Sequence, residues 1–151
     1  MAFPSSGLFV ATFVDLADTT QLALDLDLET HKLALFLDAV AGANLVTDTA
    51  YGVGAWASNE VANGSGYTTG GAAITTTTYT STGSGVITWD AADTAWTSAT
   101  FTARGGLAYA DALAGNNGII AVNFGSDIAV TAGTFTVQWN ASGIFYNDII
   151  P

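Results

Sequence analysis

The feature that most constrains this chain is a series of short β-prone runs separated by turn residues. About eight such runs follow one another at roughly ten-residue spacing, with glycine, asparagine and aspartate between them. Antiparallel sandwiches and barrels are built from strands of this length and spacing. No run of strands alternates with helices, as a parallel sheet would require. The sequence therefore predicts an all-β fold, an antiparallel β-sandwich or jelly-roll-like domain.

The clearest strand pattern lies in the first third of the chain. Leucines alternate strictly with other residues over Leu22–Glu29, which predicts a half-buried strand. Lys32–Val40 alternates in the same way with a more apolar outer face, so the two runs are expected to form a hairpin. Residues of one parity within each strand should share the buried face. The expected core holds Leu22, Leu24, Leu26, Leu28, Phe101, Val122, Phe124, Val137 and Trp139.

The later runs are bounded by glycine and aspartate. Glycines at 105 and 106 interrupt the run over 98–111, where we expect a bulge or a close backbone approach. The segment GSGYTTGG over 64–71 lacks the Lys-Ser/Thr of a phosphate loop and is read as consecutive turns with positive φ. Further strands are expected over 75–82, before the turn at 90–93, and over 119–124, 133–140 and 143–150.

The N-terminal segment is expected to differ from the rest. We assign residues 1–21 to an apolar arm or short helix and residues 22–151 to a single β domain. Apolar residues over 8–16 fall on one helical face, with Ser5 or Ser6 as the N-cap, although Gly7 and the β-prone side chains also allow a strand.

This segment is also the predicted partner-binding site. It carries no charged side chain before Asp15, and each large apolar side chain buried against a partner contributes about 1.5 to 3 kcal/mol. The expected contacts are Phe3, Leu8, Phe9, Phe13 and Val14, with Phe9 and Phe13 the main ones. Removal of residues 1–13 should then leave a folded β domain that no longer assembles.

Composition restricts the possible partners. Half of the residues are hydrophobic and 10% are charged, and the net charge is −11. Such a charge repels phosphate backbones and anionic lipid, so neither nucleic acid nor a membrane is an expected partner. The longest apolar runs also fall far short of the ~20 residues of a spanning helix. The chain has no cysteine, which removes thiolate metal sites and cysteine nucleophiles.

The side chains that could do chemistry are few. His31 is the one imidazole and is expected to be exposed in a turn, without an identifiable nucleophile or orienting acid. Asp25 and Asp27 are read as the solvated face of a strand, and Asp90 and Asp93 as turn caps in preference to metal ligands. We therefore expect no catalytic centre, no metal and no cofactor.

Arg104 and the four tryptophans could each have either a structural role or a ligand-binding role. Arg104 lies in an apolar run and is expected to form a structural ion pair with an aspartate, the alternative being a ligand-binding arginine. The four tryptophans are expected in the core or an interface, the alternative being a platform on which sugars stack.

Four segments between Lys32 and Ile150 carry a resemblance to a known family. They read KLALFLD (32–38), NEVANGSGYTTGG (59–71), WDAADTAWTSATFTARGGLAY (89–109) and IIAVNFGSDIAVTAGTFTVQWNASGI (119–144). In content and order they resemble a family of small virion structural proteins of tailed bacteriophages. The chain departs from the family pattern where Ala62 and Asn63 replace one residue, Trp89 a phenylalanine and Asn123 an aspartate. Loss of that aspartate disfavours a shared metal site.

The resemblance implies a particle component without catalytic activity. The expected role is a capsid decoration or cement protein on the outer surface of the virion shell. Its expected partners are copies of itself, as a trimer at local three-fold axes, and the major capsid protein. The alternative is a tail or neck appendage that binds a host-surface glycan, and a third reading is an independent carbohydrate-binding or hydrolase domain.

Overall fold

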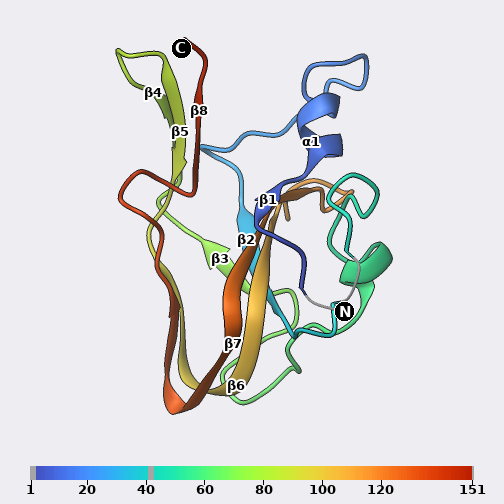
Figure 1. The fold of residues 1–151 in the computed structure, drawn as a ribbon, viewed down its shortest axis with the longest axis vertical. Coiled ribbons are helices and arrows are strands. Elements are labelled where there is room, and N and C mark those ends of the chain that lie inside the picture. The colour runs from blue at the N-terminus through green and yellow to red at the C-terminus, as the bar shows by residue number, and fades with distance from the viewer. Residues whose placement is uncertain (1–2, 41–42, 151) are drawn as a thin grey trace.

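The computed structural model describes residues 3–40 and 43–150 and shows two antiparallel sheets packed together (Figure 1). One sheet has the strand order β1-β7-β6-β2-β3 and the other β4-β5-β8. This confirms the predicted all-β sandwich with a short N-terminal helix. The elements are β1 (Gly7–Leu8), α1 (Val10–Asp15), β2 (His31–Phe36), the 3-10 helix η1 (Gly54–Ala57), β3 (Ala72–Ile74), β4 (Thr78–Ser81), β5 (Val86–Asp90), β6 (Thr94–Tyr109), β7 (Gly118–Val137) and β8 (Phe145–Asp148).

A long bent hairpin of β6 and β7 organises the fold. The two strands pair from Tyr109 and Gly118 at one end to Thr94 and Val137 at the other. Figure 1 shows both strands running to the lower end of the molecule and turning back, so that the ribbon has two arms. The pairing register of the two strands shifts by three residues between Ala103 and Gly105, and further irregularities of the pairing accompany this bend. Both arms belong to the five-stranded sheet. The first arm, around residues 105–109 of β6 and 118–123 of β7, lies between β1 and β2, and the second arm, around residues 94–96 and 135–137, folds back over it.

Strand β2 lies in the middle of the core because both of its faces are buried. Leu33 and Leu35 point into a cluster between the arms of the hairpin, which also contains Trp96 and Ile119. Ala34 and Phe36 point into a second cluster on the other face. The apolar outer face that the sequence shows over 32–40 is therefore covered by protein.

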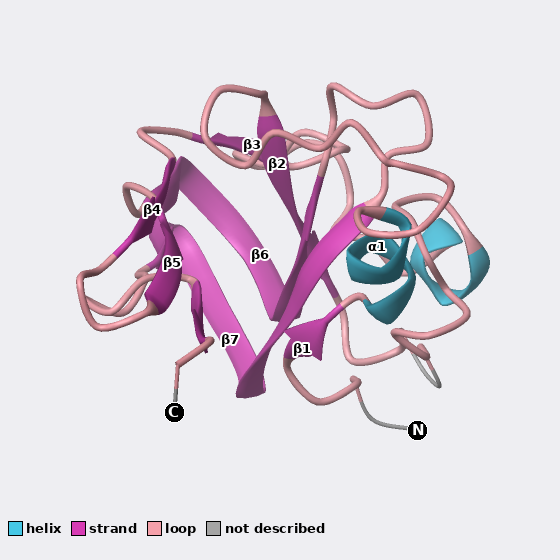
Figure 2. Ribbon diagram, turned by 90° about the horizontal axis from the view of Figure 1, so that it is seen from above, coloured by secondary structure: helices cyan, strands magenta, loops and turns pink. Residues whose placement is uncertain are grey.

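The N-terminal segment supplies that cover. Phe3 and Phe9 are buried, with ring centroids 5.7 and 6.0 Å from that of Trp56 on η1. Strand β1 pairs with β7, and the Thr12 hydroxyl of α1 donates to the carbonyl of Gly118 at 2.6 Å. Figure 2 shows α1 and β1 beside β7. The segment is part of the domain's own core, so removing residues 1–13 should destabilise the domain, contrary to the expectation from sequence.

The predicted helix and the alternative strand each describe part of this segment. Residues 7–8 form a strand and 10–15 a helix, whose N-cap is Phe9 and not Ser5 or Ser6. The Ser6 hydroxyl instead accepts the amide N–H of Asn123.

The predicted strand over Leu22–Glu29 is wrong. The segment contains no strand; residues 26–29 form a turn, where the Asp25 carboxylate accepts the amide N–H groups of Asp27 and Leu28. Of its leucines only Leu26 is buried, and Leu28 is 84% exposed. A hairpin with the next run is excluded because both edges of β2 are already paired, with β3 and β6.

Other boundaries also differ from expectation. The runs over 119–124 and 133–140 belong to one strand, β7, because Gly125 with φ of +82° and the irregular pairing absorb the residues between them. Val137 is buried as predicted, whereas the other expected core residues of the hairpin region are half-buried against the cluster between the arms. These are Phe101, Val122, Phe124 and Trp139.

The segment NEVANGSGYTTGG forms a hydrogen-bonded clasp against the sheet. One oxygen of the Glu60 carboxylate accepts the Tyr67 hydroxyl and the Gly70 amide, each at 2.7 Å, and the other accepts the Tyr51 hydroxyl at 2.8 Å. The Tyr67 hydroxyl accepts the Leu35 amide of β2. Gly71 has φ of +81°, and a Cβ there would overlap the Leu33 carbonyl. Turns with positive φ in this segment are confirmed, and they let it lie directly on β2.

Tyr67→Phe should lower the free energy of unfolding by about 1–3 kcal/mol, because it leaves the buried Leu35 amide without a partner and removes one of the hydrogen bonds to the Glu60 carboxylate. Tyr79→Phe is the matched control, since Tyr79 is 39% exposed on β4, and should change stability by less than about 0.5 kcal/mol. Chemical denaturation measures both. Equal effects of the two substitutions would show that the clasp contributes nothing specific.

Candidate functional site

The predicted partner-binding residues are divided between core and surface. Phe3 and Phe9 are buried within the chain, so they offer no surface to a partner in this fold. The expectation that Phe9 is a main partner contact is therefore wrong. Leu8 and Phe13 are half-buried, and the Phe13 ring packs edge-on against Phe145 of β8 at 5.7 Å. Val14 is 51% exposed. A partner can therefore contact this segment through the outer face of α1.

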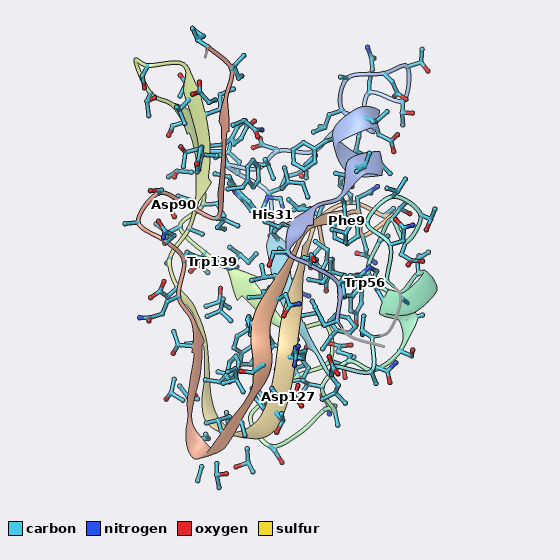
Figure 3. All side chains as sticks on the ribbon, viewed as in Figure 1. Phe9, His31, Trp56, Asp90, Asp127 and Trp139 are labelled. Carbon is cyan, nitrogen blue, oxygen red and sulfur yellow. The ribbon has the colours of Figure 1, made fainter. Side chains whose placement is uncertain are left out.

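Arg104 lies between two carboxylates on the first arm of the hairpin. Its Nε is 3.7 Å from Asp38 Oδ1, and its Nη1 is 3.7 Å from Asp127 Oδ1. Asp127 lies low on the ribbon in Figure 3. The other basic side chain, Lys32, is 3.0 Å from Asp111. Both basic side chains are thus engaged by carboxylates of the same chain.

His31 is fully buried at the start of β2, so the prediction of an exposed turn histidine is wrong. Its Nε2–H donates to the Asp25 carbonyl at 2.9 Å, and its ring meets Trp89 edge-on at 5.6 Å. Desolvation lowers the pKa of His31 below its ordinary 6.5, although the Asp25 carbonyl and the charges of Asp25 and Glu29 oppose this. The imidazole is therefore a neutral core group at pH 7.

The paired aspartates accept hydrogen bonds from backbone amides. The Asp90 carboxylate accepts the amide of Ala91, and that of Asp93 accepts the amide of Trp139 at 3.0 Å. Asp25 lies in a turn and not on a strand face, and its two backbone hydrogen bonds lower its pKa. Within residues 3–40 and 43–150 no group of three or more His, Asp or Glu side chains could hold a metal ion.

The tryptophans pack inside the molecule. Trp56, Trp89 and Trp96 are buried, and Trp89 donates its indole N–H to the Leu26 carbonyl at 2.9 Å. Trp139, two residues after the end of β7, is half-buried (Figure 3). The tryptophans therefore form no exposed platform for stacking sugars.

A groove on the hairpin is a candidate interaction surface that the sequence did not reveal. It has a volume of about 560 Å³ and is lined by both arms, with Val122 and Phe124 on one and Phe135 and Trp139 on the other. Phe124 and Phe135 meet across it with ring centroids 6.0 Å apart. Ile128, 41% exposed, lies on its rim. The sequence signal that could have located it is the near absence of charge from the hairpin strands.

A second hollow lies on the three-stranded sheet and is more polar. Its volume is about 510 Å³, and Thr80 of β4, Thr88 of β5 and Tyr146 of β8 form a row across it. Asp90 lies at its border, and Tyr146 is 63% exposed. Threonine hydroxyls, a carboxylate and an open aromatic ring together suit a hydroxyl-rich ligand.

The comparisons with known proteins add no relative. Neither the protein-family models, the curated proteins nor the solved structures contain a match to this chain. Among the helices of the part of the chain that the structure describes, none has the length and hydropathy of a membrane span.

The burial of His31 predicts a pH dependence of stability. The unfolded chain takes up a proton near pH 6.5 and the folded chain only at lower pH, so the free energy of unfolding should fall as the pH drops below about 6.5. Since the chain has one histidine, a single imidazole NMR resonance reports its titration. We expect a midpoint below 6.5, and a midpoint at or above 6.5 would contradict the burial.

Proposed function

We propose that the chain is a non-enzymatic structural protein of a tailed-phage virion, a decoration or cement protein on the outer capsid shell. The observation that carries the proposal is the order of the four family-like segments, which together span most of the chain from Lys32 to Ile150. Its partners are copies of itself, with a trimer the arrangement expected at local three-fold axes, and the major capsid protein.

The use of reactive side chains supports a role without catalysis. Glu60 is held by two tyrosine hydroxyls and a backbone amide, and His31 is buried. Burial beside Glu60 raises the pKa of Tyr51 to about 12, so its phenol stays protonated. Arg104 faces two carboxylates. These groups stabilise the fold, which suits a protein whose task is to pack against other proteins.

The net charge of the chain favours a position on the outer surface of a capsid shell. A net charge of −11 is repelled by DNA, which fills the inside of a capsid. Decoration of the outside keeps the acidic protein away from the packaged genome.

One end of the molecule is suited to contact the shell. Figure 1 shows α1 and the three-stranded sheet at the same end, together with the C-terminus. Several exposed apolar side chains lie on these elements and directly after β8. Monomeric proteins seldom expose many apolar side chains close together. The exposed side chains here are Val10, Val14, Tyr146, Ile149 and Ile150.

Purified virions should contain this chain at a copy number comparable to that of the major capsid protein, measured by quantitative mass spectrometry.

The recombinant Val14→Asp variant should bind particles that lack the chain at least about tenfold more weakly than the native chain does, because a buried carboxylate opposes the contact. Val53→Asp, at a residue 47% exposed in another part of the chain, is the matched control and should bind normally. Absence of the chain from virions would overturn the proposal.

The second candidate is a tail or neck appendage that binds a host-surface glycan, and the hollow around Tyr146 is the observation that favours it. It predicts a few copies per virion and glycan binding that is lost in Tyr146→Ala, because a sugar ring would stack on the phenol. Tyr79→Ala, on the opposite face of the same sheet, is the control. A glycan array that gives no signal with the intact chain would exclude glycan binding.

A further inference from the structure

The paired strands of the hairpin are electrically neutral in a strongly acidic chain. Strands β6 and β7 contain one basic side chain, Arg104, and one acidic side chain, Asp127, and these two lie 3.7 Å apart. Every other acidic side chain lies elsewhere in the sequence, so the net charge of −11 arises entirely outside these strands.

The outer edge of β7 is open over most of its length. Strand β1 pairs with it only at Ile120 and Ala121. Beyond Asn123, whose amide reaches Ser6, no other strand of the described ranges 3–40 and 43–150 pairs with that side. Figure 2 shows β7 with β6 on its inner side. The strand has neither the proline nor the lysine with which proteins protect such edges, and the charge of its one ionisable side chain, Asp127, is balanced by Arg104.

The groove adjoins this edge. Ile128 and Val130 line it from the middle of β7, and Phe135 and Trp139 from the second arm. An open strand edge beside an apolar groove provides both main-chain hydrogen-bonding groups and apolar area for one partner strand.

We propose that β7 of a second copy of this chain pairs antiparallel with the open edge, centred on residues 126–131, and places its Ile128 against the groove. This contact relates two copies about a two-fold axis and is therefore distinct from the trimer expected at three-fold axes. It rests on the proposed function only in that copies of this chain associate.

Charge selects a second copy as the occupant. At 0.15 M salt the Debye length is about 8 Å, so two chains of like charge repel least where their facing surfaces carry no net charge. For a copy of this chain the hairpin is such a surface. A basic partner would instead gain more from the acidic parts of the molecule. An antiparallel pair of identical edges is also self-complementary about a two-fold axis.

The test measures self-association of the purified chain alone by sedimentation, so it is independent of whether the chain is found in virions. Ile128→Asp and Ile128→Lys should each raise the dissociation constant at least about tenfold, since both place a charge in the contact. They change the net charge in opposite directions. If general repulsion alone governed association, Ile128→Lys would strengthen it.

Leu28→Asp and Leu28→Lys are the matched controls, because Leu28 is 84% exposed and lies in the turn segment before β2. They should leave the dissociation constant within about twofold of the native value. Circular dichroism verifies that all variants are folded. A native chain that stays monomeric at high concentration, or equal effects at 28 and 128, would overturn the proposal. So would a monomeric chain whose Ile128 variants lose binding to particles, since the edge would then serve the shell.

Discussion

The pairing of β6 with β7 is the interaction on which the other elements depend. Its first arm carries β1 on one side and β2 on the other, and β3 joins through β2. Its second arm folds back and covers the cluster that contains Leu33, Leu35 and Trp96. Because the ribbon contributes its inner face to the core along both arms, its strands contain few charged residues. Apart from Asp127, the acidic side chains consequently lie in the loops and the shorter elements.

Burial of both faces of β2 imposes a second requirement. A strand with apolar side chains on two sides needs a layer on each. The second arm of the hairpin is one layer, and the N-terminal segment with η1 is the other. Phe3, Phe9 and Trp56 fill this second layer. The hydrophobic N-terminus, which in isolation indicates a surface for partners, is thereby used within the chain, and Val14 is left as its outward part.

The sequence was informative where the local pattern and the long-range structure agree. Alternation located β2, glycines located the turns around Tyr67, and the Gly105 region is irregular as expected. It was misleading over Leu22–Glu29, where alternation suggests a strand but Asp25 caps a turn and β2 has no free edge. Burial of His31 could not be predicted either, because it depends on Trp89 and on the turn that contains Asp25.

The candidate surfaces were the least predictable part. The groove joins residues that are distant along β7, and only the bend of the ribbon brings Phe124 to Phe135. The hollow with Tyr146 needs the pairing of β4, β5 and β8. Charge distribution was visible in the sequence, but its meaning depends on knowing that β7 has an open edge.

In the proposed assembly this acidic chain uses one neutral strand edge for contact with its own copies. Hydrogen–deuterium exchange of the native chain at low and high protein concentration tests it most directly. We expect the amides of residues 126–131 to exchange more slowly at high concentration, while those of residues 22–30 do not change. Protection that stays the same at both concentrations, or that appears on α1 and not on β7, would contradict it.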